Sequence, residues 1–419
     1  MRPFSFLPAI AAAVLACATP AALPAQSAPG GPIRIVGTVR RQAITVESAD
    51  SELNNLARRA FKAHGNYDLV AGADTRLSLV KTGANSVRGD FTSKRRGIRS
   101  SQAFTGASWQ EAALRACDDA LERDGQRPFF SGKLAFVSDR TGSKEVYAGD
   151  LFLSVATPLT NYRSVVLSPR WTHTGTEVLH TTYVNGNFTD IYAVDVRDPR
   201  RRRGVVVGAR GTTTGAVSNP RTGRLAFTSS ARGDMDIFGA DASGGGARLL
   251  VRTPKNNVET DPAWSADGTL LAYVSGASGR PSLHVSNADG SAPRRLPTAG
   301  IRYATEPAWN PVFKTKIAFT YQEGGVFALA VLDTATSKVT RLEVRGAQNH
   351  THPIWCADGR HLIATQTSGR ASRLVLVDTL TGLPGLDGAD VNPSDRRVTV
   401  LSNAGWANCY EADYRAPAR

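Results

Sequence analysis

A Pro-x-Trp motif recurs along this chain at nearly constant intervals, and it constrains the fold more than any other feature. The fullest copy spans Glu259–Ser275, where the motif is followed by Asp267-Gly268 and a short apolar run. Asp-Gly between two short strands predicts a tight hairpin, because glycine accepts the positive φ that this turn requires. The motif positions are Trp171, Val217 (a degenerate copy), Trp264, Trp309 and Trp355, in steps of 46, 47, 45 and 46 residues.

A second series of apolar strands keeps the same register. These strands end on Asp150, Asp195, Asp241, Asn287, Asp333 and Asp378, which are 45, 46, 46, 46 and 45 residues apart. Six repeats of this length, each with room for about four strands, predict a six-bladed β-propeller. The expected fold class is therefore mainly β.

The first 25 residues predict a secretory signal peptide. A lone Arg2 precedes an apolar run that is too short for a membrane span, and a small-residue tail ends at Ala25. An alternative is a lipoprotein signal in which Cys17 is acylated. Soluble export to the periplasm is favoured, because a further Ala/Pro-rich cleavage region follows Cys17.

Residues 26–128 predict a small α/β domain. Strands are expected at Ile33–Val36 and Ala43–Val46, and an amphipathic helix at Ser51–His64 that Gly65 terminates. Further strands are expected at Tyr67–Ala71 and Leu77–Lys81, and Ser108 resembles the N-cap of a second helix over Ala112–Leu121.

The propeller is expected over residues 129–415. Its first repeat begins at Lys133–Phe136 without an upstream Pro-x-Trp strand, and Glu411–Tyr414 resembles the missing strand with Tyr in place of Trp. A C-terminal strand that completes the first blade would close the ring and remove an open edge. The insertion Thr379–Asp395 should form a surface loop.

Three cysteines remain after the predicted cleavage: Cys117, Cys356 and Cys409. Their spacing matches no zinc motif. A Cys356–Cys409 disulfide is one reading, and three unpaired buried cysteines are the favoured one.

The net charge of +14 favours anionic partners or surfaces. The export signal argues against nucleic acid. Arg200–Arg203 and Lys94–Arg96 are candidate anion patches, although such runs are usually solvated turns.

A signal peptide, a small α/β domain and six repeats closed by a C-terminal strand together resemble the TolB family. The segments that carry the resemblance are Ile33–Val36, the helix after Asp50 and Thr305–Trp309. The missing Trp of the third repeat and the long sixth-repeat insertion depart from the family pattern. The resemblance implies a non-enzymatic periplasmic scaffold of the Tol–Pal system, at most peripheral to the outer membrane.

The residues just before each Pro-x-Trp motif are expected to begin the innermost strands and to converge on the mouth of the central channel. The resemblance implies that a peptidoglycan-associated lipoprotein binds there. The predicted mouth residues are Thr213, Glu259, Thr260, Asp261, Thr305, Glu306, His350, His352 and Glu411. The alternative is that these groups cap turns or lie in water. By resemblance, Ile33, Arg34, Ile35 and Val36 would contact an inner-membrane Tol component.

No cofactor and no metal site are expected. Converging acids could hold a divalent cation in the channel, but no ligand set has diagnostic spacing, and His350, His352 and His361 lack an identifiable third ligand. The chain has no Gly-x-Ser-x-Gly elbow. The alternatives to a Tol–Pal scaffold are a channel-centred enzyme or binding protein for a sugar or peptide, and a paralogue that binds another envelope protein.

Overall fold

The structure is a computed structural model of the 419-residue chain. It describes residues 40–184, 186–208, 210–251, 257–342, 348–383, 398–402, 405–406 and 408–417. The predicted signal peptide, Cys17 and the predicted strand Ile33–Val36 lie outside the described residues, as do residues 384–395 of the predicted insertion.

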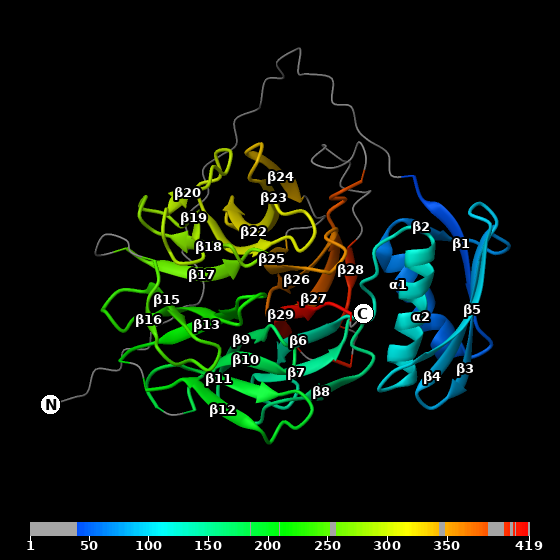
Figure 1. Cartoon of the computed structure of the whole chain (residues 1–419), viewed down its shortest axis with the longest axis horizontal. Helices are drawn as coiled ribbons and strands as arrows, with labels where there is room; N and C mark the ends of the chain where they lie inside the picture. Colours follow the sequence, from blue (N-terminus) through cyan, green and yellow to red (C-terminus); the bar gives the residue numbers. More distant parts are fainter. Residues whose placement is uncertain are drawn as a thin grey trace, which may run out of the picture. The chain divides into compact units, whose positions relative to one another are not determined.

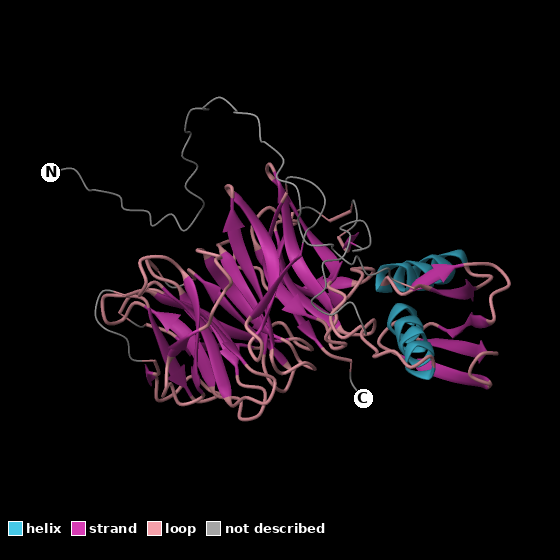
Figure 2. Ribbon diagram, turned by 90° about the horizontal axis from the view of Figure 1, so that it is seen from above, coloured by secondary structure: helices cyan, strands magenta, loops and turns pink. Residues whose placement is uncertain are grey.

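The first described region is an α/β domain with a five-stranded sheet and two helices (Figures 1 and 2). Its elements are β1 (Gln42–Glu47), α1 (Ser51–His64), β2 (Tyr67–Leu69), β3 (Thr75–Gly83), β4 (Ser86–Ser93), β5 (Ile98–Thr105) and α2 (Trp109–Arg123). The sheet order is β2-β1-β3-β4-β5, with β1 parallel to both of its neighbours. The small α/β domain predicted from the sequence is therefore confirmed.

Capping residues determine where both helices begin and where α1 ends. The Asp50 carboxylate accepts the Leu53 N–H at 2.9 Å, and Ser108 Oγ accepts the Glu111 N–H at 3.3 Å, which satisfies one free amide of each first turn. Helix α1 ends at Gly65, whose φ of 79° is in the left-handed region.

Six four-stranded sheets form the propeller, and the fold prediction is confirmed. Blade 1 contains β29 (Cys409–Arg415), β6 (Lys133–Ser138), β7 (Glu145–Asp150) and β8 (Ala156–Pro158). Blade 2 contains β9 (Val166–Trp171), β10 (Glu177–Thr182), β11 (Asp190–Asp195) and β12 (Arg202–Val206). Blade 3 contains β13 (Thr213–Ser218), β14 (Leu225–Ser229), β15 (Asp236–Ala240) and β16 (Arg248–Leu249).

The remaining blades keep the same order. Blade 4 contains β17 (Glu259–Trp264), β18 (Leu270–Ser275), β19 (Ser282–Asn287) and β20 (Arg294–Arg295). Blade 5 contains β21 (Ala304–Trp309), β22 (Lys316–Glu323), β23 (Val326–Asp333) and β24 (Lys338–Leu342). Blade 6 contains β25 (Asn349–Trp355), β26 (His361–Ser368), β27 (Ala371–Asp378) and β28 (Val398–Val400). In each blade the strand named first is the innermost.

The C-terminal strand closes the ring as predicted. Strand β29 pairs antiparallel with β6, so the first and last parts of the propeller share one sheet. Tyr414 takes the place of the motif Trp, and its hydroxyl donates to the Phe129 carbonyl at 2.7 Å. A β-carbon on Gly132 would clash with the Tyr414 ring, so a larger residue at Gly132 would displace that ring.

The motif tryptophans pack between blades. Trp171, Trp309 and Trp355 are buried, whereas Trp264 is half-buried. The indole N–H of Trp264 donates to the Val217 carbonyl, and that of Trp355 to the Ala308 carbonyl. Both bonds reach the innermost strand of the preceding blade, whereas the buried indole N–H groups of Trp171 and Trp309 have no hydrogen-bond partner in the described chain.

The segment between α2 and β6 is fixed by a buried carboxylate. Asp118 accepts the backbone N–H groups of Phe129, Phe130 and Ser131 at 2.8–2.9 Å. Burial raises the pKa of Asp118 to about 6, although these hydrogen bonds act against the shift. The two Phe rings join one core cluster with Phe61 and Tyr67.

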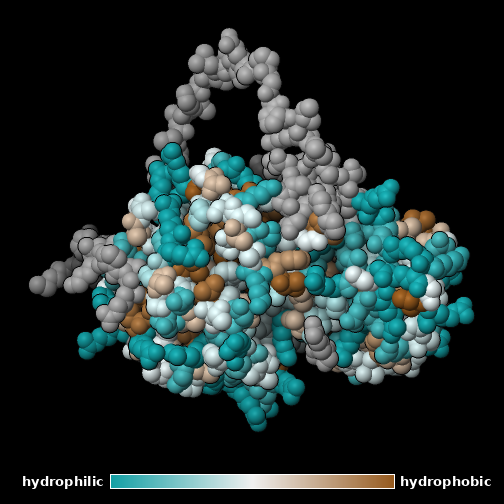
Figure 3. All heavy atoms as spheres, turned by 45° about the horizontal axis from the view of Figure 1, so that its top comes forward, coloured by the Kyte–Doolittle hydropathy of each residue, from teal (hydrophilic) through white to brown (hydrophobic). Residues whose placement is uncertain are grey.

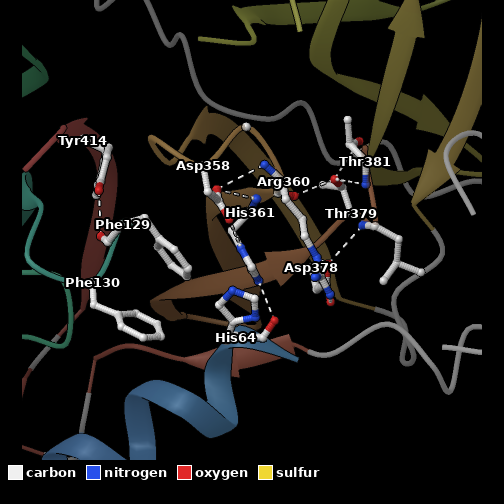
Figure 4. A network of polar contacts seen from close by, with 12 residues as sticks. His64, Phe129, Phe130, Asp358, Arg360, His361, Asp378, Thr379, Thr381 and Tyr414 are labelled. Carbon is white, nitrogen blue, oxygen red and sulfur yellow. Dashed lines mark hydrogen bonds and ion pairs between the residues drawn. The ribbon is translucent and has the colours of Figure 1, made fainter. Parts of the chain in front are cut away.

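Helix α1 contacts blade 6 through a buried polar network, here called the junction network (Figure 4). His361 Nε2 lies 3.0 Å from the His64 carbonyl, and His361 Nδ1 lies 2.5 Å from Asp358 Oδ2. Arg360 donates Nε–H and Nη2–H to the two oxygens of Asp378 at 2.7 and 2.5 Å. Burial raises the pKa of Asp378, but Arg360 outweighs this and holds the pKa below its ordinary value.

Cys117, Cys356 and Cys409 are buried and form no disulfide with one another, as the favoured interpretation expected. Hydrophilic residues cover most of the face drawn in Figure 3, where hydrophobic residues form small separate patches. In the described part of the chain, neither helix has the length and hydropathy needed to cross a bilayer.

Candidate functional site

Each innermost strand contains an irregular step at the same repeat position. The pairing register shifts in all six strands, and one residue at each shift has a positive φ. These six residues, here called the channel ring, are Ser168, Gly215, Asp261, Glu306, His352 and Glu411. Their φ values are 52°, 65°, 53°, 54°, 53° and 32°. Non-glycine residues adopt such backbone geometry rarely, and it clusters at functional sites.

A bulge frees backbone N–H groups from the sheet ladder, and the ring carboxylates accept them. Glu306 Oε2 accepts the His352 N–H at 2.7 Å, and Glu411 Oε2 accepts the Ser168 N–H at 2.7 Å. The Glu306 backbone N–H also lies near Asp261 and lowers its pKa. Each acid therefore reaches the equivalent residue of the next blade. These contacts give the ring carboxylates a structural role that requires no ligand.

His352 and Glu306 also form a side-chain pair. His352 Nε2 lies 3.1 Å from Glu306 Oε1, with the two side chains 33% and 22% exposed. The surrounding protein alone lowers the pKa of His352, but the carboxylates of Glu306, Glu411 and Asp261 raise it above its ordinary value. The charged imidazolium is thus stabilised inside an acidic ring.

Asp261 is the most accessible acid of the ring. Its surface is open to solvent, yet protein surrounds it, as expected for a channel wall. Loss of bulk water and the nearby Glu306 carboxylate raise the pKa of Asp261 to about 6. Perturbed acids of this kind are over-represented at binding and catalytic sites.

Three predicted mouth residues lie elsewhere. Glu259, Thr213 and His350 are 0%, 0% and 2% exposed, so the expectation that they face a partner at the mouth is wrong. Each sits two positions before a ring residue, and the bulge breaks the alternation that would otherwise place both on one face. Ser275 Oγ donates to Glu259 at 2.9 Å, and Thr213 Oγ donates to the Thr189 carbonyl.

The other predicted residues lie in or beside the ring. Asp261, Glu306, His352 and Glu411 belong to it, while Thr260 and Thr305 immediately precede ring members and are half-buried. Two ring members were not predicted, Ser168 and Gly215. Ser168 could have been found, because it precedes Pro169 in the Pro-x-Trp repeat as Asp261 precedes Pro262.

Two further charged residues beside the ring were also missed. Burial raises the pKa of Asp413, and the half-buried Arg170 opposes that shift as it opposes the raised pKa of Asp261. Asp413 is buried and accepts the Trp171 N–H at 2.7 Å. Both follow ring residues by two positions, where the other repeats carry Ala, Val or Ile.

Among the described residues no cluster of three His, Cys, Asp or Glu side chains has the geometry of a metal site. His350 lies 2.9 Å from Gln366 Nε2, and His361 belongs to the junction network. The three histidines considered for zinc therefore lie in three separate environments.

The two basic runs are largely paired with acids. Arg200 and Arg201 contact Asp198, Arg203 contacts Glu177, and Arg202 lies over the Tyr162 ring. Lys94 contacts Asp74, and Arg95 and Arg96 contact Asp124. Neighbouring acids therefore offset part of the positive charge of each run.

The strand ends that lead into the ring lie at one face of the propeller, here called the mouth face. Two kinds of segment build it: those that precede the innermost strands, and the turns between the second and third strands. They lie together because the start of each innermost strand pairs with the end of the second strand of its blade. Five of the eight exposed large hydrophobic residues in the described chain lie there: Val165, Val184, Phe188, Val207 and Val258. Exposed apolar groups around a charged opening suit a protein interface.

The family model for the PD40 TolB β-propeller domain matches residues 123–384. The chain belongs to the TolB β-propeller family. Among curated proteins it is similar to a Protein TolB homolog of Chlorobium chlorochromatii, with 31% identity over 39% of this chain and 37% of that protein. It is also similar to the Tol-Pal system protein TolB of Anaeromyxobacter dehalogenans, with 30% identity over 38% of this chain and 36% of that protein.

These alignments span little more than a third of each TolB relative. The whole architecture finds a counterpart in the crystal structure of TolB from Acinetobacter baumannii, with a TM-score of 0.72 and 15% identity over 91% of this chain and 98% of that one. At that identity the likeness shows the fold alone, which includes the α/β domain before the propeller.

Proposed function

We propose that this chain is a non-enzymatic, periplasmic TolB-like scaffold of a Tol–Pal-type envelope assembly, and that a partner protein docks at the channel ring. The observation that carries the proposal is the ring itself. Glu306, His352 and Glu411 are half-buried, Asp261 is open to solvent, and all four converge from separate blades on strained backbone. Membership of the TolB family and the similarity to a Tol-Pal system protein support the kind of assembly.

The charge of the ring specifies the docking group. The ring carries three carboxylates and one imidazole, on a protein whose overall charge is +14. A concave acidic opening focuses its field on a cationic group. The partner is therefore expected to insert a basic side chain, and by resemblance a peptidoglycan-associated lipoprotein is the first candidate. Segment 33–36 would contact an inner-membrane Tol protein.

The test uses the double variant Asp261→Asn/Glu306→Gln. The amide oxygens can still accept the bulge N–H groups, so the fold should persist while two charges disappear. We expect binding of the soluble domain of the lipoprotein, measured by calorimetry, to weaken about tenfold or more. The matched control is Asp289→Asn, an exposed carboxylate on the turn between β19 and β20. Equal affinity of the folded double variant and the control would refute docking at the ring.

One observation favours a second candidate, an enzyme that acts on a sugar or peptide in the channel. An acid with a pKa of about 6, such as Asp261, can act as a proton donor near neutral pH. Such an enzyme would release product from envelope polysaccharide or peptide, and Asp261→Asn would abolish that release. A scaffold would leave both substrates intact.

A further inference from the structure

A groove on the mouth face joins blades 4 and 5. One cavity of about 630 Å³ is lined by Ser278, Arg280, Arg295, Thr298 and Arg302, among others. A second cavity of about 550 Å³ shares Arg280, Gly300, Ile301 and Arg302 with the first, and adds Tyr303, Tyr321 and Gln322. The two cavities form one feature, here called the arginine groove.

The three arginines of this groove are not neutralised. Arg280, Arg295 and Arg302 are exposed, and no carboxylate of the described chain makes an ion pair with them. Glu323 at the far wall is paired with Arg341 at 3.4 Å. The contrast with Arg200–Arg203 is direct, because that run is conspicuous in sequence yet largely paired with acids.

The groove wall is preorganised. Thr298 Oγ donates to the Ile301 carbonyl at 2.9 Å, and the Ala304 N–H donates to the Pro281 carbonyl at 3.1 Å. Leu296 and Ile301 anchor the loop in the core of blades 4 and 5. Little conformational entropy would therefore be lost when a ligand binds this backbone.

The groove leads to the channel ring. Tyr303 lines its second cavity and lies three residues before Glu306, on the segment that enters β21. Burial raises the pKa of Tyr303, and the carboxylates of Glu306 and Asp261 raise it further. The Tyr303 ring packs edge-on against Phe327 at 6.0 Å. Arg302 of the groove and Glu306 of the ring are four residues apart on this segment, so one stretch of chain carries both signs of charge.

We propose that the arginine groove binds an acidic stretch of an extended polypeptide, and that a basic residue following this stretch enters the channel ring. This rests on the proposed docking at the ring. Arginine forks pair with carboxylates in two-point contacts. A chain that carries both signs in sequence fits this path, whereas an anionic lipid or polysaccharide supplies no cation for the ring.

The probe is a fluorescent peptide of six glutamates, two glycines and a terminal arginine amide, and the measurement is anisotropy at low and high salt. The groove variant Arg280→Gln/Arg302→Gln should weaken binding about tenfold or more and should reduce the salt dependence. The matched control, Arg200→Gln/Arg201→Gln, removes two arginines from the paired run and should leave affinity unchanged. Thermal melts establish that both variants fold.

A second peptide that lacks the terminal arginine separates this proposal from docking at the ring. Groove variants should weaken both peptides, whereas Asp261→Asn/Glu306→Gln should weaken only the peptide with arginine. If the ring variant has no effect while the groove variant does, the groove stands and the ring proposal fails. Affinity that the groove variant leaves unchanged would overturn the groove proposal. Tighter, groove-dependent binding of phosphatidylglycerol vesicles or heparin would overturn it in favour of a lipid or polysaccharide ligand.

Discussion

The channel ring and the junction network both pair a histidine with a carboxylate, but in opposite environments. In the ring, the His352–Glu306 pair is partly open to solvent and its members come from neighbouring blades. In the junction network, His361 and Asp358 are 0% and 5% exposed and lie three residues apart, with a carbonyl of helix α1 on the other ring nitrogen. The first pair can meet a ligand, whereas the second holds parts of the molecule together.

The comparison shows that residue type alone does not identify function in this repeat. His361 contacts an acceptor at each ring nitrogen, so its hydrogen-bonding capacity is used within the protein. Glu306 and His352 keep 22% and 33% of their side-chain surface exposed. Buried groups of this kind contribute to stability, and accessible ones contribute to recognition. The following predictions test that division.

The largest effect on stability is expected from Asp378→Ala. It leaves the Arg360 guanidinium buried without its two-point partner, which typically costs about 3–5 kcal/mol. Glu306→Gln in the ring should cost about 1 kcal/mol or less, because the pair is partly solvated and the amide still accepts the bulge N–H. Urea denaturation measures both free energies of unfolding. Similar losses for the two variants would remove the distinction.

A smaller effect is expected from Gly65→Ala at the end of helix α1. The residue has a φ of 79°, and its added β-carbon would lie 2.5 Å from Asp378 Oδ2. Gly72→Ala is a matched control, since Gly72 has a φ of 73° and no atom within 4 Å of the added carbon. Both variants lose about 1–2 kcal/mol from the left-handed backbone. Thermal melts should show a further loss for Gly65→Ala only, and equal melting temperatures would mean that Asp378 moves away without cost.

The smallest effect is a shift in proton affinity. Because the ring carboxylates raise the pKa of His352, the folded state holds its proton more tightly than the unfolded state. The resulting stabilisation is complete below about pH 6.5 and is lost as pH rises through the raised pKa. His180 is buried in blade 2 with its pKa lowered to about 4, so its contribution has the opposite sign and appears as pH rises from about 4 to 6.5.

Histidine NMR titration measures both groups. Glu306→Gln should lower the pKa of His352 and leave that of His180 where it was. An unchanged His352 titration in the variant would show that Glu306 is not its main electrostatic partner.

The repeat itself could be predicted from the sequence, because four blades carry a Trp at the same position, where it packs between blades, and Tyr414 replaces it in blade 1. Helices α1 and α2 were also predictable from Asp50, Ser108 and Gly65, since caps act within a few residues. The ring was predictable only in part. Asp261 and Glu259 are two apart, and regular strand geometry would place them on one face, but the bulge sends one into the channel and the other into the blade.

The junction network and the arginine groove depend on tertiary contacts that leave no local pattern. His64 and His361 are 297 residues apart, and nothing near either residue indicates the other. Arg280 and Arg302 are isolated in sequence, whereas the conspicuous Arg200–Arg203 run is largely paired with acids. Whether a basic residue is available to a ligand depends on its three-dimensional neighbours.

Strand β29 closes the propeller and also carries Glu411, which joins the ring and accepts the Ser168 N–H of blade 2. Ribosomes make proteins from the N-terminus, so five ring positions emerge before this one. Until β29 docks, the opening lacks one of its three carboxylates and the Ser168 amide lacks its acceptor. A partner whose binding requires all three ring carboxylates would therefore bind only the chain in which β29 has docked. Such a partner would distinguish the completely folded propeller from a partly folded one.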